Sequence, residues 1–357
     1  MALSKIKSSS MADTAIHGRR NLIINGAMTI DQRNSGSSVN LANDKVFAVD
    51  RFYWIENSSE TPTSQQVTDA PNGFTHSVKI TNTSTTTTPS YTQLIHRIEG
   101  NNVSQLYFGN SSAESVTLSF YVKSSLTGQF SASLRNADSD RSNVSTYTIN
   151  SANTWERKII TFVGDTTGTW ATDTSVGLNI IFRLDDTGGT SSLNQWTATG
   201  DAFASGSVRF MGNASATWQI TGVQLEVGEQ ATPFEHRSFG EELALCQRYY
   251  WHTYSYGTPA GTTFNQDYEA PIIIIGTGNH GMGVCNAVYP VEMRALPAVS
   301  FYGSDGTANR IRYWNSGSLS TYGTVNRSTR QILGMSFDAG TNPEDFYSAA
   351  LVCDAEL

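Results

Sequence analysis

Residues 116–123 read Val116-Thr117-Leu118-Ser119-Phe120-Tyr121-Val122-Lys123, and an apolar side chain recurs at every second position. Successive side chains of a β-strand point to opposite faces of the sheet, so a period of two predicts a strand with one face in a core. The other positions, Ser119, Tyr121 and Lys123, form a face of mixed character. We therefore expect a half-buried strand here.

Short apolar runs of the same kind recur from Asn21 to about Glu235. They are Leu22-Ile23-Ile24, Lys158 to Val163, Val176 to Phe182 and Trp218 to Leu225. The stretches between them, such as Asn82 to Pro89, Asp138 to Asn143 and Thr187 to Ser192, are rich in Gly, Ser, Thr, Asn and Asp, which suit turns. Many short strands with regular turns predict a β-sandwich.

One helix is predicted, and it begins at Ser238. Ser238-Phe239-Gly240-Glu241 has the form of a capping box, in which the serine hydroxyl and the glutamate each satisfy a free backbone N–H. We expect a short helix to about Arg248 that links two β-domains. Strands are then predicted at Tyr249 to Tyr256, Ala270 to Ile275, Met282 to Tyr289, Ala298 to Tyr302, Arg310 to Trp314, Gln331 to Phe337 and Ser348 to Ala355.

The length of 357 residues favours two domains with a short appendage. We expect an N-terminal arm at 1–19, a first β-domain at 20–236, a linker helix at 237–250 and a smaller antiparallel β-sandwich at 251–357. Charged residues make up only 15 % of the chain, against about 25 % in an average soluble protein. Ser, Thr, Asn and Gly take the place of the charged residues, and they suit strands and turns better than helices. The whole fold is therefore predicted to be all-β.

The net charge of −8 argues against a nucleic-acid partner and against an anionic membrane surface, since both draw their affinity from clustered Lys and Arg. The only local basic excess lies in the first twenty residues, where Lys5, Lys7, Arg19 and Arg20 face a single acid. With Ile6 they form a candidate docking arm. No stretch approaches the ~18–20 apolar residues of a membrane span, and the N-terminus lacks the apolar centre of a signal peptide.

Three cysteines, Cys246, Cys285 and Cys353, cannot form a closed set of disulfides. We expect free, buried thiols of a protein that folds in a reducing cytoplasm.

Motifs for catalysis and cofactors fail on their context. Ile272 to Ile275 followed by Gly276-Thr277-Gly278-Asn279-His280-Gly281 matches a dinucleotide fingerprint, but no helix or βαβ unit follows, so we expect a hairpin turn. Asp138 to Asn143 lacks the glycine and the final glutamate of a calcium loop, and structural calcium is unsupported. No paired metal-ligand spacing and no GxSxG motif occur. We predict no enzyme, no metal and no cofactor, although scattered carboxylates leave a polysaccharide depolymerase open.

Aromatic residues are the most informative class. Five crowd into eight positions at Tyr249, Tyr250, Trp251, Tyr254 and Tyr256. Such rings either bind the apolar faces of sugars or fill a core and a subunit interface, and both interpretations stay open. The candidate binding residues, for a glycan or a subunit interface, are these five with Tyr313 and Trp314.

Several motifs resemble those of bacteriophage tail-fibre and related tail proteins. The resemblance rests on Leu3 to Lys7 with Met11-Ala12-Asp13, Asn21 to Met28 with Gln32-Arg33 and Val49 to Phe52, Gln224 to Gly228 with Ala231 to Glu235 and Arg237, Cys246 to Tyr250, Val291 to Pro297, and Asp354 to Leu357. It spans nearly the whole chain, and each motif is moderately specific.

The resemblance implies a virion protein of the phage tail, often a homotrimer, whose first domain is a jelly roll like those of carbohydrate-binding modules. It implies attachment to other tail or baseplate proteins through residues 1–19 and recognition of a host polysaccharide or lipopolysaccharide. The expected location is the tail of the virion, after synthesis in the host cytoplasm without a signal peptide. The alternative function is a structural adaptor or decoration protein that binds no receptor.

Overall fold

The computed structural model describes residues 19–41, 45–56, 61–85, 91–264, 273–275, 282–313, 319–320, 324–338 and 346–357. In the strands from residue 273 onward, side chains are described at Val288, at 298–302 and at 350–354. At the other positions of these strands only the backbone is described. The chain divides into two compact units. The first comprises residues 19–29 and 36–237, and the second comprises residues 30–35 and 238–357, each within the described ranges.

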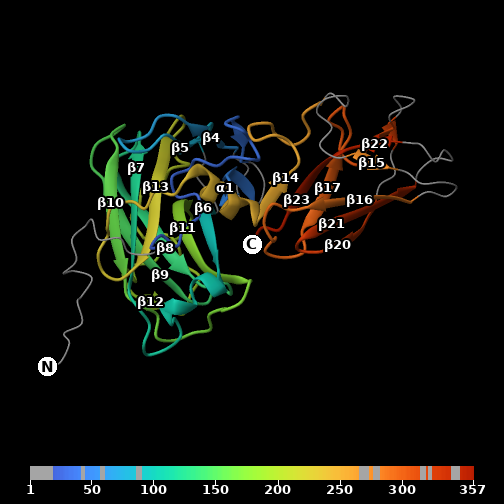
Figure 1. Cartoon of the computed structure of the whole chain (residues 1–357). Helices are drawn as coiled ribbons and strands as arrows, with labels where there is room; N and C mark the ends of the chain where they lie inside the picture. The colour runs from blue at the N-terminus through green and yellow to red at the C-terminus, as the bar shows by residue number, and fades with distance from the viewer. Residues whose placement is uncertain are drawn as a thin grey trace. The chain divides into compact units, whose positions relative to one another are not determined.

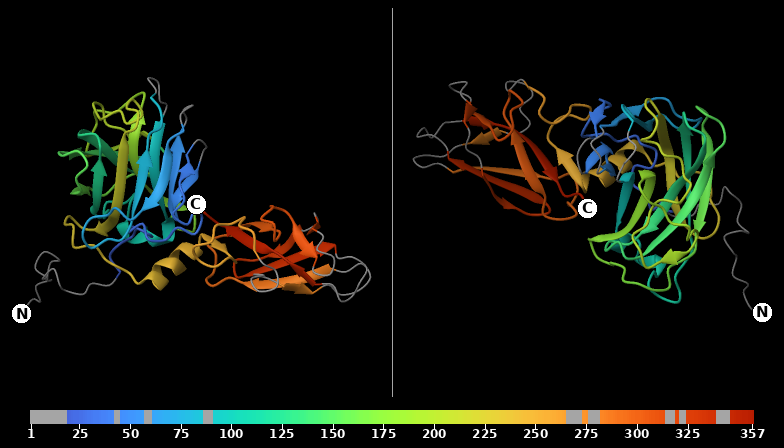
Figure 2. Two further views of the ribbon diagram at one scale, coloured as in Figure 1. Left: turned by 90° about the horizontal axis from the view of Figure 1, so that it is seen from above. Right: turned by 180° about the vertical axis from the view of Figure 1, so that it is seen from behind.

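The first unit is built from two antiparallel sheets. The six-stranded sheet has the order β1 (Val39–Asn40), β4 (Thr63–Val67), β5 (Ser77–Thr81), β13 (Thr217–Val227), β7 (Val116–Ser124) and β10 (Glu156–Phe162). The seven-stranded sheet has the order β12 (Trp196–Thr197), β9 (Ser142–Ile149), β8 (Gly128–Arg135), β11 (Val176–Asp186), β6 (Tyr91–Glu99), β3 (Phe52–Glu56) and β2 (Val46–Val49). Figures 1 and 2 show the two sheets face to face, which confirms the predicted jelly-roll sandwich.

The core lies between the two sheets. Val116, Leu118, Phe120 and Val122 of β7 are all fully buried, as their period of two predicts. The Phe120 ring meets Phe182 of the facing sheet with ring centroids 5.0 Å apart. Trp218 is also buried, and its indole Nε1 donates to the Tyr147 hydroxyl across the core at 3.2 Å. Aromatic packing therefore joins the two sheets.

A buried histidine gives the first unit a dependence on pH. His96 is 1 % exposed and packs on Phe52. Burial and the nearby charges of Arg51 and Arg237 hold the pKa of His96 well below its ordinary value of 6.5. The unfolded chain therefore takes up this proton first, so stability is complete above about pH 6.5 and falls as the pH drops below it.

We expect the free energy of unfolding to decrease below pH 6.5 by up to about 1.4 kcal/mol per pH unit through His96. Replacing His96→Leu should remove that part of the decrease. Urea unfolding followed by tryptophan fluorescence at pH 7.0 and 5.5 measures the difference, with the exposed His236→Gln as the control. An unchanged pH slope in the leucine variant would contradict the assignment.

The second unit opens with the one α-helix among the described residues, α1 (Phe239–Gln247). The Ser238 hydroxyl accepts from the backbone N–H of Glu241, and the Glu241 side chain accepts from the backbone N–H of Ser238. The predicted capping box is thus confirmed. The segment 30–35, which the sequence-based boundaries placed in the first domain, belongs to this second unit.

The described part of the second unit also contains three small antiparallel sheets. They have the orders β14 (Tyr250–His252), β23 (Ala350–Asp354), β17 (Ala298–Tyr302); β15 (Ile273–Ile275), β22 (Phe346–Ser348), β18 (Ile311–Tyr313), β19 (Leu319–Ser320); and β16 (Met282–Val288), β21 (Ile332–Asp338), β20 (Thr324–Ser328). The all-β prediction is confirmed. The isoleucine strand β15 pairs antiparallel with β22, unlike a dinucleotide-binding strand. The glycines at 276–281 lie outside the described residues.

The predicted strand from Tyr249 to Tyr256 is wrong in its length, because β14 ends at His252. The backbone N–H of Thr258 donates to the carbonyl of Ser255 at 3.0 Å, which closes a turn. Gly257 occupies that turn with φ of 89°, a conformation that favours glycine.

Two of the three cysteines, Cys246 and Cys353, are buried thiols that form no disulfide, as predicted. Burial raises the pKa of the Cys353 thiol to about 12, so it stays protonated and unreactive at neutral pH. The side chain of Cys285 lies outside the described residues.

Candidate functional site

The aromatic run of the second unit does not form one exposed surface. Tyr249, Tyr250 and Tyr254 are buried, Trp251 is half-buried, and Tyr256 is 44 % exposed. The Trp251 ring packs on Tyr289, and the Tyr256 ring packs on Phe239. Of the run, Trp251 and Tyr256 are the members with rings that reach the surface.

The buried members of the run hold other segments of the second unit. The guanidinium of Arg33 lies 3.6 Å from the centre of the Tyr250 ring and pairs with Asp354 at 2.9 Å. The Gln32 amide donates to the Tyr250 carbonyl at 3.0 Å. Tyr250 therefore anchors the segment 30–35 beside the strand β23. The roles of the other two candidate binding residues stay predictions. Tyr313 lies in β18 opposite Tyr347, but the structure describes only the backbone of Tyr313. Trp314 lies outside the described residues.

The candidate docking arm is described only at its end, because Lys5, Ile6 and Lys7 lie outside the described residues. Arg19 is exposed and lines a pocket of about 200 Å³ with the amide side chains of Asn21, Asn101, Asn102 and Gln105.

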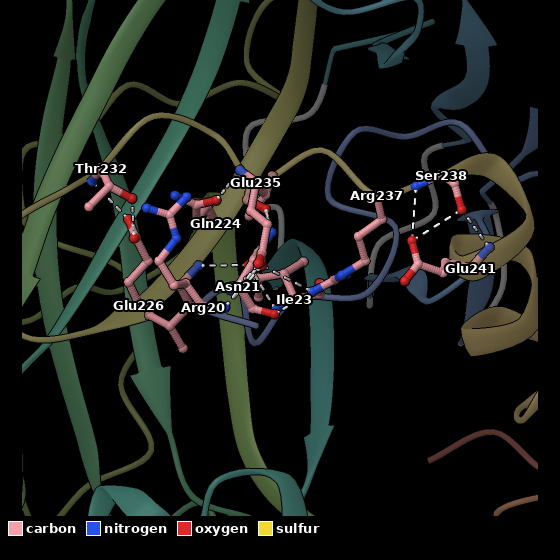
Figure 3. Close-up of polar contacts among 12 residues, drawn as sticks. Arg20, Asn21, Ile23, Gln224, Glu226, Thr232, Glu235, Arg237, Ser238 and Glu241 are labelled. Atoms are coloured by element: carbon pink, nitrogen blue, oxygen red, sulfur yellow. Dashed lines mark hydrogen bonds and ion pairs between the residues drawn. The ribbon is translucent and has the colours of Figure 1, made fainter. Parts of the chain in front are cut away.

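The opening and closing segments of the first unit are joined by a set of polar contacts that we call the clasp (Figure 3). The Glu235 carboxylate accepts from the backbone N–H of Arg20 at 3.1 Å and from that of Asn21 at 2.7 Å. The backbone N–H of Glu235 in turn donates to the Gln224 side chain at 2.7 Å. The clasp thus ties residues more than two hundred positions apart in the chain.

Two further side chains complete the clasp. The Arg237 guanidinium donates to the carbonyl oxygens of Ile23, at 2.9 Å, and of Asn21. The Asn21 side chain bonds to the backbone of Ile23 and of two residues of β13, Val223 and Leu225. Several residues that carry the resemblance to tail-fibre proteins therefore have a structural role in closing the sandwich.

One grouping of partly exposed aromatic rings in the first unit comes from two loops and the short strand β12. We define the aromatic cluster as Phe108, Trp170 and Trp196, which are all half-buried. Their ring centroids lie 4.9, 5.6 and 5.3 Å apart, and each pair meets nearly at right angles. Strand β12, which carries Trp196, lies at the lower end of the first unit in Figure 1.

An ion pair joins the half-buried Arg141 to the buried Asp165 in the loop that leads to Trp170. Arg141 Nε donates to Asp165 at 2.8 Å, and its Nη2 donates to the second carboxylate oxygen at 2.5 Å. The Asp165 carboxylate also accepts from the backbone N–H and hydroxyl of Thr167. Hydrogen bonding to Asp165 raises the pKa of Arg141, so its guanidinium stays charged. Both tryptophans donate Nε1 to backbone carbonyls, at 3.2 and 2.7 Å, which fixes their rings before any ligand arrives.

No protein-family model and no curated protein sequence matches this chain. Among solved structures, it is similar to the enzymatically active domain of tailspike protein 4 of bacteriophage CBA120, with 13 % identity and a TM-score of 0.33. That match covers 58 % of this chain and 21 % of the tailspike chain, so the chain spans about a fifth of that protein's length.

Two carbohydrate-binding modules are also similar. The CBM22-1 xylan-binding domain of Paenibacillus barcinonensis Xyn10C has 10 % identity and a TM-score of 0.27, and the match covers 54 % of this chain and 94 % of that one. A family 11 module of Clostridium thermocellum, in complex with a mixed-linked tetrasaccharide, has 12 % identity and a TM-score of 0.28 over 53 % and 97 %.

No helix among the described residues is both long and apolar enough to cross a membrane. Within the same residues, no group of three or more His, Cys, Asp and Glu side chains is placed to hold a metal ion.

Proposed function

We propose that this protein is a fibre-like component of a phage tail that recognises a glycan on the host cell surface without cleaving it. The observation that supports glycan binding is the rigid aromatic cluster, Phe108, Trp170 and Trp196. Flat rings pack on the apolar faces of sugar rings, while neighbouring hydroxyl and amide groups bind the sugar hydroxyls. The two tryptophan rings, already held by hydrogen bonds from Nε1 to backbone carbonyls, lose little conformational freedom on binding.

The proposal includes attachment through residues 1–19 to other tail or baseplate proteins, and a homotrimer as the assembled form. Trp251 and Tyr256 of the second unit are proposed to lie at a glycan site or a subunit interface, because aromatic rings that reach the surface favour both. Light scattering should then give a mass near three times 38.8 kDa.

We expect Trp170→Ala to weaken binding of host surface polysaccharide at least tenfold, which corresponds to about 1.4 kcal/mol. The variant lacks an indole ring that the wild type positions in advance through its hydrogen bond to the Thr167 carbonyl. Isothermal titration calorimetry with purified polysaccharide measures the affinity, and assays of cell adsorption measure the consequence. New reducing ends in the polysaccharide would show cleavage and contradict the non-enzymatic part of the proposal.

A matched control is Trp155→Ala, which removes a half-buried tryptophan bonded to Asp69 on the six-stranded side of the sandwich. Equal losses in both variants would point to general destabilisation. Unchanged affinity in the Trp170 variant would reject the aromatic cluster as the glycan site.

The clasp favours a second candidate, a structural adaptor that binds no receptor. Glu235 and Arg237 hold the two ends of the first unit together, as a protein that transmits load between its neighbours requires. An adaptor would bind no polysaccharide, and deletion of residues 1–19 would reduce the yield of particles. A monomer in solution would also favour this alternative.

A further inference from the structure

Three arginines stand on the outward face of the seven-stranded sheet. Arg97 of β6 and Arg135 of β8 are both direct partners of Asn179 on β11, one on each side. Arg183 lies four residues further along β11 and so faces the same side. Strand spacing of about 4.8 Å places the backbones of Arg97 and Arg135 roughly 10 Å apart, within reach of each other's side chains. We call these three residues the arginine face.

The outward direction of the arginine face follows from the packing of β11. Ile180 and Phe182 belong to the core cluster between the sheets. Ile181 belongs to a separate small cluster with Ile95 and Tyr53. Odd-numbered residues of β11 from 179 to 183 therefore point away from the core.

Two of the three arginines are fixed by their neighbours. Arg183 donates twice to the Gln93 side-chain oxygen, at 2.9 and 2.7 Å, and forms an ion pair with Asp186. Arg97 Nε donates to the Asn179 side chain at 3.1 Å. These guanidinium groups are thus positioned before any ligand binds.

Arg135 lacks a comparable set of partners. Its Nη1 donates to the Gly200 carbonyl at 3.2 Å, and its buried Nε has no hydrogen-bond partner among the described residues. Burial and repulsion by Arg183 and Arg97 lower the pKa of Arg135 to about 10. The negative charges of the nearby Asp186 and Asp201 instead favour the charged form of Arg183. Arg135 is therefore a partly desolvated cation that forms no ion pair with the carboxylates of the described residues.

We infer that the arginine face binds an oxyanion carried by a saccharide, the carboxylate of an acidic sugar or a phosphate substituent. Guanidinium groups bind carboxylate and phosphate through paired N–H donors, and an anion beside Arg135 would relieve the repulsion among the three cations. The chain as a whole carries a net charge of −8, so a polyanion is not attracted by the overall charge. The site is distinct in its residues from the aromatic cluster, and its ligand chemistry is separate from the proposed stacking of neutral sugar rings.

The test uses three polysaccharides and the full chain. Polygalacturonate carries carboxylates, a phosphorylated mannan carries phosphate, and dextran is neutral. At 50 mM NaCl we expect the wild type to bind at least one of the two acidic polymers. Its affinity for that polymer should fall when the salt is raised to 300 mM. At 50 mM its affinity for dextran should be at least tenfold weaker than its affinity for the acidic polymer. Arg135→Gln should reduce the affinity for the acidic polymer at least tenfold. The two acidic probes show which oxyanion source the site prefers.

The control is Arg157→Gln, which makes the same change of charge at an exposed position of β10 in the other sheet. It should leave the affinity within twofold of the wild type. Equal losses in both glutamine variants, or no binding of either acidic polymer by the wild type, would overturn the inference. Thermal unfolding gives a second reading, because the acidic polymer should raise the melting temperature of the wild type and not that of Arg135→Gln.

If Arg135→Gln does not fold, Arg135→Lys keeps the charge but loses the paired donors and should still lose at least threefold in affinity. Binding of dextran and acidic polymers with equal affinity would overturn the inference while leaving the proposed glycan recognition intact. If Trp170→Ala loses binding of the host surface polysaccharide but still binds the acidic polymer, the aromatic cluster and the arginine face are two separate sites.

Discussion

Replacing Gly26 by alanine should destabilise the first unit by about 3 kcal/mol. A Cβ atom at this position would lie 2.1 Å from the carbonyl oxygen of Val223 and 3.1 Å from its carbonyl carbon. Both atoms belong to the backbone of β13, and Val223 lies between Thr221 and Gln224, which pair with β7, so this backbone cannot move aside as a flexible side chain can. The backbone N–H of Val223 also donates to the Gly26 carbonyl at 2.9 Å, so a shift would break this bond.

Guanidinium unfolding of the wild type and of Gly26→Ala measures this effect as a lowered midpoint. Gly188→Ala is the matched control in the same unit, because a Cβ there would meet no heavy atom within 4 Å. The control should change the free energy of unfolding by less than about 0.5 kcal/mol. A Gly26→Ala variant within 1 kcal/mol of the wild type would show that the opening segment moves away from β13 more easily than this contact implies.

The fold was predictable where local pattern and tertiary packing agree. In β7 the alternation from Val116 to Val122 fixes which side chains enter the core, whatever the neighbouring strands are. The cap at Ser238 depends only on residues within one helical turn, so the sequence predicts it well. The predicted strand at Tyr249 was too long because the aromatic residues Tyr254 and Tyr256 resemble a continued strand. In the structure β14 ends at His252, and the chain then turns at Gly257.

The candidate sites were less predictable because they depend on pairing between distant strands and loops. Phe108 and Trp170 lie in loops and Trp196 lies in β12, so no single stretch of the sequence gathers the three rings. Arg97 and Arg135 meet across Asn179 only through the register of three strands. The crowded run at Tyr249 and Tyr250 was the visible signal, yet these two rings are buried.

Removing the Glu235 carboxylate should open the clasp and cost about 3 kcal/mol in the free energy of unfolding of the first unit. Glu235→Ala leaves the backbone N–H groups of Arg20 and Asn21 without this acceptor and takes a carboxylate from beside Arg237, whose side chain is 8 % exposed. Hydrogen bonds to a charged group contribute more than neutral ones, so Glu235→Gln, which keeps one oxygen, should lose roughly half as much.

Hydrogen exchange of a peptide that covers residues 20–24 reads the clasp directly and should quicken at least tenfold in Glu235→Ala. Glu229→Ala removes an exposed carboxylate from the same closing segment and should leave this exchange rate unchanged. Because Arg237 still donates to the carbonyls of Ile23 and Asn21, the opening segment is expected to loosen at its backbone N–H groups first. Equal protection in the wild type and in Glu235→Ala would mean that Arg237 and Asn21 hold the two ends of the sandwich by themselves.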